Sequence, residues 1–384
     1  MKTLRFLPAC LFVVAATVAS SSAYPIRRWT YDAAGSNYDF GLAFGKEFGE
    51  EIRARLDQNE QLRIMLNEFD GSERYNSFYA SHQKKYPEYM SELQGMADGA
   101  NVNFEALFIN QMSQEFTYYM KGYEHKKVFT DHCSDVVLYK SEDEMFMAHN
   151  EDSAKFDVNG SVLVEAVNGV NNGPGFTTFV YMGNTPTGAF GFNTEGVVFT
   201  MNYQVPSKPD AAGFGRVFIA RAMLDSSSFE DAVQIAAKTP MIGGHNYQIG
   251  EHNSNKLVNV EVASFGTYSI KTFAAGDPAF FHANMYTNLN VSQWTDPSSV
   301  HRAARFKAIQ ATHPVHSTVG MRGVLGDQED VKYPVYHDDK GRANGDISGS
   351  YTLISIVVDL KKGVMEFFSK NPKLNSPDFN LTIC

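Results

Sequence analysis

Cys133 is the residue whose setting most favours nucleophilic chemistry. The sequence contains three cysteines, and the other two stand in an apolar leader (Cys10) and at the last position (Cys384). The residues that follow Cys133 alternate as in a strand, whereas a papain-like cysteine opens a helix. If the peptide bond before Cys133 is cut, the new α-amino group, with an ordinary pKa of about 8, can take the thiol proton. Nucleophile and base would then belong to one residue.

A disulfide between Cys133 and Cys384 is the alternative for these two residues, because a secretory compartment permits such a bridge. Two cysteines outside the leader do not make a disulfide framework. If this bridge forms, the chain is a non-catalytic secreted protein.

Other catalytic motifs are absent from the sequence. No HExxH string occurs and the histidines lack the short mutual spacing of a helix-borne site, so no metal site is predicted. The string nearest to a serine-hydrolase elbow, Gly345 to Gly349, has the wrong spacing. Glycine pairs at 173/175 and 213/215 lack the third glycine of a dinucleotide fingerprint. The sequence therefore implies no cofactor.

Composition and the leader restrict the partners and the compartment. The chain has 384 residues, 43% of them hydrophobic, and a formal net charge of −10, which argues against disorder and against nucleic acid as a partner. Residues 1–23 combine a positive start, an apolar run too short for the roughly 20 residues of a membrane span, and small residues before Tyr24. We expect a signal peptide, no membrane span and a secreted or lysosomal protein. Three sequons fit this route, at Asn159, Asn290 and Asn380.

The elements that must position Cys133 change in kind along the chain. The N-terminal third predicts helices, and glycines at 41, 45 and 49 predict close contact along one helix face. From Cys133 onward the pattern predicts strands, beginning with a hairpin over 135–148 that turns at 141–143. The expected helices are 41–49, 53–69, one from 87, 104–116, 217–224, 229–237 and 299–311. The other expected strands are 162–167, 176–182, 189–193, 197–201, 246–249, 257–262, 268–272, 351–360 and 364–369. This order indicates one α+β domain over residues 24–384.

The strings around Cys133 resemble those of a known family. Asp131 to Leu138, followed by His149 to Asp152, is similar to the start of the nucleophile chain in the acyl-CoA:isopenicillin N acyltransferase-like family, the C45 peptidases. In these N-terminal-nucleophile hydrolases a cysteine opens a strand and an aspartate lies nineteen residues later, as Asp152 does here. Further similar strings follow in the same order, at 41–49, 92–97, 110–115, 191–197, 282–284, 301–305, 351–353 and 364–366. The resemblance implies an αββα sandwich of two antiparallel sheets covered by helices.

The resemblance also implies roles for individual residues. Cys133 matches the nucleophile, exposed by self-cleavage at His132/Cys133 into chains 24–132 and 133–384 that would form a heterodimer. Asp152 matches the residue that holds the new α-amino group, and Asn284 the donor to the tetrahedral oxyanion. For substrate binding, Arg302 matches an arginine near the catalytic pair and Asn150 borders the pocket. From the residues alone, each also has a structural interpretation: an Asx turn for Asp152, a backbone contact for Asn284 and a solvated helix charge for Arg302.

The reaction implied is hydrolysis of a linear amide through a thioester on Cys133. Members of the family acylate penicillin nuclei or split β-alanyl conjugates of amines. We therefore expect a cysteine amidohydrolase acting on small N-acyl or β-aminoacyl amines. An acyltransferase with the same acyl-enzyme and a lysosomal lipid amidase remain alternatives.

Overall fold

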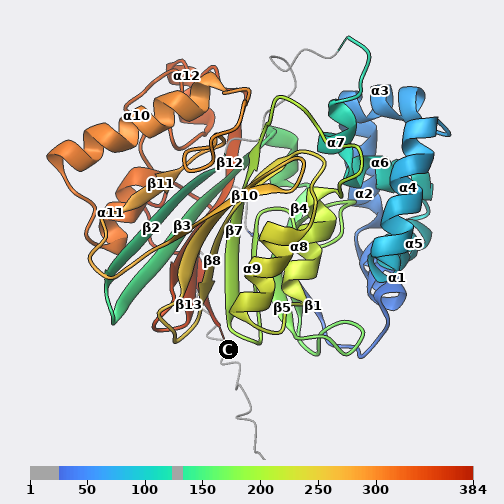
Figure 1. The fold of residues 1–384 in the computed structure, drawn as a ribbon, viewed down its shortest axis with the longest axis horizontal. Helices are drawn as coiled ribbons and strands as arrows, with labels where there is room; N and C mark the ends of the chain where they lie inside the picture. Colours follow the sequence, from blue (N-terminus) through green and yellow to red (C-terminus); the bar gives the residue numbers. More distant parts are fainter. Residues whose placement is uncertain (1–25, 123–132, 384) are drawn as a thin grey trace, which may run out of the picture.

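Two β-sheets form the centre of the molecule (Figure 1). This computed structural model describes residues 26–122 and 133–383. The expected leader (1–23), His132 and Cys384 lie outside these ranges, so the predicted signal cleavage, self-cleavage and Cys133–Cys384 bridge stay predictions. Among the described residues, no helix has both the length and the apolar character that a membrane crossing requires.

The larger sheet has eight strands. Its neighbours are antiparallel except at one edge, where β1 pairs with β4 in parallel. In sheet order the strands are β1 (Arg28–Tyr31), β4 (Ser161–Ala166), β5 (Phe176–Tyr181), β6 (Phe190–Asn193), β7 (Val197–Gln204), β8 (Gly244–Glu251), β9 (Leu257–Ala263) and β10 (Thr267–Thr272). Residues 26–122 therefore contribute a strand to a sheet built otherwise from residues beyond 133.

The smaller sheet has six strands, and all its neighbours are antiparallel. In sheet order they are β11 (Phe280–His282), β2 (Ser134–Ser141), β3 (Glu144–Ser153), β12 (Tyr351–Asp359), β13 (Val364–Phe368) and β14 (Phe379–Thr382). The hairpin predicted after Cys133 is β2–β3, and it turns at the charged residues Glu142 and Asp143, as expected.

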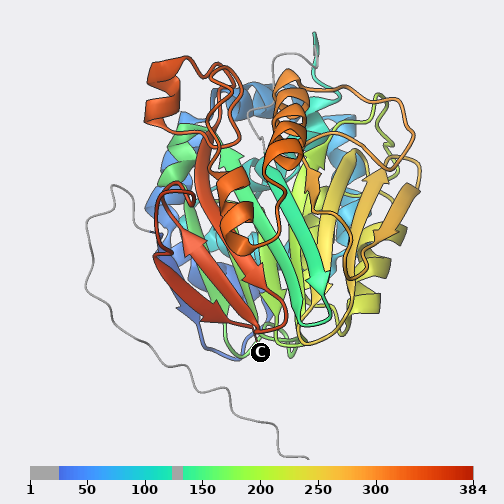
Figure 2. The same ribbon diagram turned by 90° about the vertical axis from the view of Figure 1, so that its left-hand side faces the viewer.

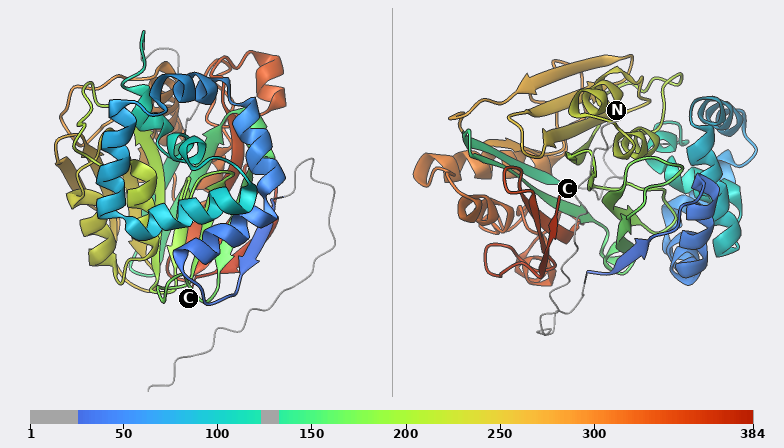
Figure 3. Two further views of the ribbon diagram at one scale, coloured as in Figure 1. Left: turned by 90° about the vertical axis from the view of Figure 1, so that its right-hand side faces the viewer. Right: turned by 90° about the horizontal axis from the view of Figure 1, so that it is seen from below.

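Helices cover the outer faces of both sheets. Figure 3 (left) shows the N-terminal helices in front of the strands, and Figure 2 shows α10 and α11 over the smaller sheet. Outside the larger sheet lie α1 (Asn37–Glu47), α2 (Gly49–Gln58), α3 (Glu60–Phe69), α4 (Glu73–Lys85), α5 (Pro87–Ala100), α6 (Phe104–Gln111), α7 (Ser113–Thr117), α8 (Arg216–Leu224) and α9 (Phe229–Lys238). On the smaller sheet's side are α10 (Pro297–Thr312), α11 (Thr318–Leu325) and α12 (Asp339–Asn344), while the 3-10 helix η2 (Lys155–Val158) follows β3. The predicted αββα layering is confirmed.

The alternating direction of side chains along the strands explains how these layers pack. On β2, Val137 and Tyr139 point into the apolar layer between the sheets, where Met147 of β3 joins them. Their chain neighbours Val136 and Leu138 point the other way and pack under α10 and α11. Both faces of the β2–β3 hairpin are therefore buried.

The close helix contact predicted from the glycine pattern occurs between α1 and α5. A Cβ added at Gly41 would stand 1.9 Å from the carbonyl oxygen of Glu92, and one at Gly95 would stand 2.1 Å from that of Tyr38. Backbone packs directly on backbone here, which only glycine permits.

Two predicted helices are interrupted. The helix expected over 53–69 divides because the Asn59 side chain accepts a hydrogen bond from the Leu62 amide at 3.0 Å and so caps a new helix, α3. The helix expected over 104–116 divides at Met112 into α6 and α7.

Candidate active site

The hairpin register places the candidate residues on two opposite faces. Ser134 pairs with Asn150 and Asp135 with His149, and residues directly opposite share a face. We call the face toward the larger sheet the thiol face, which carries Cys133, Asp135, His149 and Glu151. We call the face toward α10 and α11 the arginine face, which carries Ser134, Asn150 and Asp152.

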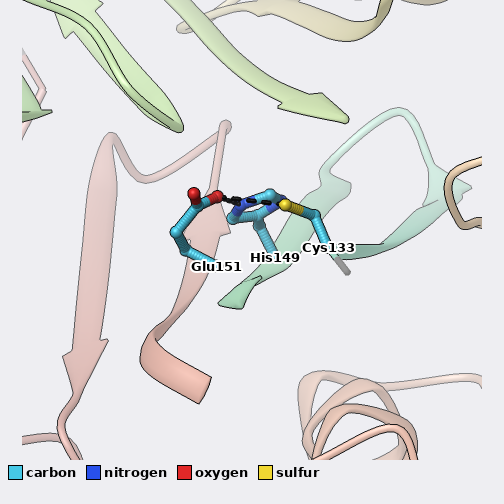
Figure 4. Close-up of side chains that lie close together, drawn as sticks. All are labelled: Cys133, His149 and Glu151. Atoms are coloured by element: carbon cyan, nitrogen blue, oxygen red, sulfur yellow. Dashed lines mark hydrogen bonds and ion pairs between the residues drawn. The ribbon is translucent and has the colours of Figure 1, made fainter. Parts of the chain in front are cut away.

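On the thiol face, Cys133 lies against two ionisable side chains (Figure 4). Its Sγ donates to Glu151 Oε2 at 3.2 Å, and His149 Nε2 contacts the same oxygen at 3.0 Å. The other ring nitrogen of His149 contacts Asp135 Oδ1 at 2.8 Å. Tyr181 of β5 donates to Oε1 of Glu151, so both carboxylate oxygens are engaged.

The charge of His149 follows from its partners. Burial lowers the pKa of His149, but the carboxylates of Asp135 and Glu151 outweigh that effect and raise it to about 10. His149 is therefore an imidazolium at neutral pH, donating one N–H to each carboxylate.

On the arginine face, a fully buried Arg302 from α10 holds the backbone of Cys133. Its Nη1 donates to the carbonyl oxygen of Cys133 and, at 2.9 Å, to Ser134 Oγ, while Nη2 donates to Asn284 Oδ1 at 2.9 Å. The remaining donations go to Ser298 at 3.0 Å and Ser299 at 3.2 Å, so all five guanidinium N–H groups are used. Arg302 is thus no solvated helix charge, because its side chain joins Cys133 to Asn284.

Both polar atoms of the Asn284 side chain form hydrogen bonds. Its Oδ1 accepts from Arg302, and its Nδ2 donates to the Tyr203 carbonyl at 3.1 Å, leaving a second N–H on the same nitrogen. That N–H is the chemical group that an oxyanion donor needs.

Asp152 is buried on the arginine face and accepts a hydrogen bond from Thr352 Oγ1 at 2.6 Å. Burial raises the pKa of Asp152 to about 8, although the Thr352 hydrogen bond and the charge of Arg302 act in the opposite direction. Its Oδ2 accepts no hydrogen bond within the part of the chain that is described, and His337 Nε2 lies 3.9 Å from it.

Asn150 is placed differently from the other four candidate site residues, Cys133, Asp152, Asn284 and Arg302. It is fully buried, and its Nδ2 donates to the carbonyl oxygens of Leu325 at 2.9 Å and Val335 at 3.1 Å. Its Oδ1 accepts from Ser355 Oγ at 2.6 Å. These bonds anchor backbone after α11 to the sheet, so the structure gives Asn150 a positioning contact.

A cavity lies next to Tyr181, the tyrosine that donates to Glu151. It has a volume of about 270 Å³ and is lined by polar side chains such as Asn110 and Gln111, but its lining does not include Cys133, Asp152, Asn284 or Arg302. A cavity of this size is at the small end of ligand pockets.

The three sequon asparagines, Asn159, Asn290 and Asn380, are all exposed. Asn380 lies in the edge strand β14, and Asn159 follows η2. Each is accessible to modification, which stays a prediction.

Comparison with known proteins places the chain in a family. Residues 139–374 match the family described as acyl-coenzyme A:6-aminopenicillanic acid acyl-transferase. The chain belongs to this acyltransferase family. The match includes Asp152, Asn284 and Arg302 and begins within β2, after Cys133. The predicted family, and with it an amide-cleaving enzyme of the C45 type, is confirmed.

Individual relatives span most of the chain. The beta-alanyl-dopamine/carcinine hydrolase of Drosophila melanogaster is 24% identical over 373 residues, covering 91% of this chain and 94% of that protein. Among solved structures, a Caenorhabditis elegans orthologue of N-acylethanolamine-hydrolyzing acid amidase aligns with a TM-score of 0.43 and 12% identity, over 66% of this chain and 100% of its own. A mutant of the conjugated bile acid hydrolase from Clostridium perfringens aligns with a TM-score of 0.36 and 11% identity, over 65% and 96%.

Sequence reasoning missed the thiol-face partners of this family member. Helix spacing of histidines does not reveal these partners, because His149 and Glu151 reach Cys133 across a strand pair. The signal was present, because the turn at 142–143 pairs Ser134 with Asn150 and therefore sets residue 133 beside residue 151.

Proposed function

We propose that this chain is a cysteine amidohydrolase that matures by cutting its own His132–Cys133 bond and then hydrolyses linear amides of small N-acyl or β-aminoacyl amines. The observation that carries the proposal is the Arg302 contact. One buried guanidinium fixes both the backbone carbonyl of Cys133 and the amide of Asn284. Nucleophile and oxyanion donor are thereby held by one rigid group.

Maturation is an acyl shift followed by hydrolysis. Cys133 Sγ attacks the carbonyl carbon of His132, the C–N bond between the two residues breaks, and the nitrogen takes the thiol proton and becomes the α-amino group. Water then hydrolyses the thioester and releases the carboxylate of His132. Asp152 supports this step, because its Oδ2 offers an acceptor to the new amine.

Turnover uses the same atoms. The α-amino group of Cys133 takes the thiol proton as Sγ attacks the substrate amide carbonyl, and Asn284 donates to the oxyanion. The ammonium then returns the proton to the leaving amine nitrogen, and water hydrolyses the acyl thioester. An acyltransferase differs only in the final acceptor.

Two observations favour a small substrate. The Drosophila relative, which is similar along nearly the whole chain, is named for β-alanyl conjugates of small amines. The cavity of about 270 Å³ beside Tyr181 is lined largely by polar side chains. Such a lining favours a small polar conjugate over the long acyl chain of a lipid amide.

Maturation is tested by N-terminal sequencing and intact mass of the purified protein. We expect a chain that starts at Cys133 and a second that ends at His132. The Cys133→Ala variant stays uncut, whereas the Cys384→Ser control is cut normally. A Cys133→Ala chain that still divides at 132/133, or a wild-type protein with a Cys133–Cys384 bridge, would overturn the proposal.

Substrate class is tested by comparing kcat/KM on β-alanyl, short-acyl and long-chain acyl amides, with an added acceptor amine to detect transfer. We expect the β-alanyl amides to be cleaved best and water to be the main acceptor. A preference for long-chain amides would instead support the lipid amidase.

The same proposal places the protein in the secretory pathway as a secreted or lysosomal enzyme, supported by the leader 1–23 and the exposed sequons. Expression in animal cells should give a protein that begins at Tyr24 and loses mass on treatment with an N-glycosidase. Retention of residues 1–23 would contradict this part.

A further inference from the structure

Three potential metal ligands of different chemistry converge on the thiol face. Cys133 Sγ, His149 Nε2 and Glu151 Oε2 are buried and lie within 4.8 Å of one another (Figure 4). Thiolate, imidazole and carboxylate are the three ligand types that bind Zn²⁺ in proteins.

Two of the three spacings are close to those of a tetrahedral site. Zinc–ligand bonds of about 2.0 to 2.3 Å put neighbouring ligand atoms about 3.3 to 3.6 Å apart. Here Glu151 Oε2 lies 3.2 Å from Cys133 Sγ and 3.0 Å from His149 Nε2, and all three ligand atoms lie within 4.8 Å of one another. Side-chain adjustments of about an ångström or less would bring all three into the range for the ion.

Supporting contacts around the ligands are already in place. Asp135 Oδ1 contacts the second ring nitrogen of His149 at 2.8 Å, the carboxylate–histidine pairing typical of zinc ligands. Tyr181 donates to the other oxygen of Glu151, which fixes the orientation of the carboxylate. Both contacts leave His149 Nε2 and Glu151 Oε2 on the side of Cys133.

A second buried histidine–glutamate pair, which has no neighbouring thiol among the described residues, serves as a comparison for this group. His282 Nε2 contacts Glu261 Oε1 at 3.0 Å, as in the His149–Glu151 pair. The Glu261 oxygens, however, also accept from the backbone amides of residues 287 to 289. Within the described part of the chain, only Cys133, His149 and Glu151 form a group of three such ligands.

We propose that Cys133, His149 and Glu151 form a Zn²⁺ site that holds the nucleophile as a metal thiolate. Binding displaces the thiol proton and the proton on His149 Nε2 to solvent. The sulfur lone pair is then donated to the metal and cannot attack a carbonyl. Zn²⁺ is therefore a reversible inhibitor, and this consequence, unlike the binding itself, rests on the proposed function.

Binding is tested with Co²⁺ as a spectroscopic substitute for Zn²⁺ on the purified protein. We expect one equivalent of Co²⁺ to give a sulfur-to-metal charge-transfer band in the near ultraviolet, which Zn²⁺ abolishes by displacement. Cys133→Ala removes the band, and Cys384→Ser keeps it. A band that survives in Cys133→Ala, or no band in the wild-type protein, overturns the proposal.

Ligand identity is tested with conservative variants whose folding is checked by thermal melting. Glu151→Gln should weaken Zn²⁺ binding, measured by competition with a chromogenic chelator, by at least about 100-fold. Asp135→Asn, which alters only the contact to His149, should weaken it by about 10- to 100-fold. The matched variant Glu261→Gln should leave the affinity unchanged. Equal affinities in folded Glu151→Gln and wild-type protein would exclude Glu151 as a ligand.

Inhibition is measured separately. Stoichiometric Zn²⁺ should stop both self-cleavage and amide turnover, and excess chelator should restore them. If the Co²⁺ band appears but no amide is ever cleaved, the metal site stands and the proposed function fails. If amides are cleaved and Zn²⁺ has no effect, the metal proposal fails alone.

Discussion

The two faces of the β2–β3 hairpin hold Cys133 by different means. On the thiol face, its sulfur donates to Glu151, which also contacts His149, and His149 in turn contacts Asp135. On the arginine face, its backbone carbonyl accepts from Arg302, whose other acceptors are neutral side-chain oxygens. One face therefore contacts the thiol, and the other fixes the position of the Cys133 backbone.

This difference implies that the two faces can be disabled separately. Substitutions on the arginine face should impair amide turnover while the metal-binding thiol network persists. Substitutions of Asp135 or Glu151 on the thiol face should have the opposite pattern, whereas loss of Cys133, which belongs to both functions, abolishes both. Any other variant that abolishes both together without unfolding would break the distinction.

The largest effect is expected for Asp152→Asn. The amide keeps the size of the carboxyl group but can replace the oxygen that accepts from the α-amino group with an N–H donor, so turnover should fall by about 10²- to 10⁴-fold. The Co²⁺ band of Cys133 should remain, because Asp152 lies on the opposite face. The comparison needs kcat/KM and the absorption spectrum of the same preparation, with Asp359→Asn at the far end of β12 as the control.

Arg302→Lys should have the next largest effect. Lysine keeps the positive charge but has only three N–H donors and no planar fork, so Cys133 and Asn284 lose their shared contact. We expect turnover to fall by about 10²-fold from misplacement of the nucleophile. A melting curve should also show a loss of stability of about 3 kcal/mol from buried acceptors left unsatisfied. Wild-type kcat in Arg302→Lys would show that charge alone suffices.

Glu151→Gln should affect turnover less than either arginine-face variant, by less than about tenfold, because Asp152 and Arg302 still position the reacting groups. Its main effect should be on metal affinity, as described above. Steady-state kinetics in the presence of a chelator separates the two effects. A drop in kcat as large as that of Asp152→Asn would mean that Glu151 takes part in the chemistry.

The smallest effect is expected for Thr352→Val, which removes the hydroxyl that donates to Asp152 and accepts from the His337 amide. Loss of these two hydrogen bonds should cost about 2 kcal/mol in the free energy of unfolding, measured by urea denaturation. Ser355→Ala, which removes the donor to Asn150, is the comparison and should cost about half as much. Equal costs for the two variants would indicate that the contact to Asp152 adds nothing to stability.

Much of the fold could be predicted because it depends on local patterns. Alternation and a charged turn predict the β2–β3 hairpin, and the glycines at 41 and 45 predict the close α1–α5 contact. Short edge strands such as β1, β11 and β14 carry too few residues for a periodic signal. The polar helix α4 has a similarly weak apolar pattern.

The site was less predictable because its members are far apart in sequence. Arg302 contacts Cys133 across 169 residues, and only the family resemblance connected the two. The roles of His149 and Glu151 depend on strand register, which must be combined with the position of the cysteine. Asn150 was expected to border the pocket, but its side-chain bonds go to backbone and to Ser355, a contact that no string around it reveals.

Strand β1 has a consequence for the proposed self-cleavage between His132 and Cys133. It lies beside β4 through four paired residues, although the two strands would belong to separate polypeptides. Its aromatic neighbours and the helices after it share an apolar core with strands from the other side of the cut. The shorter polypeptide could leave only by exposing that core to water, so both products should elute together from a sizing column and part only in denaturant.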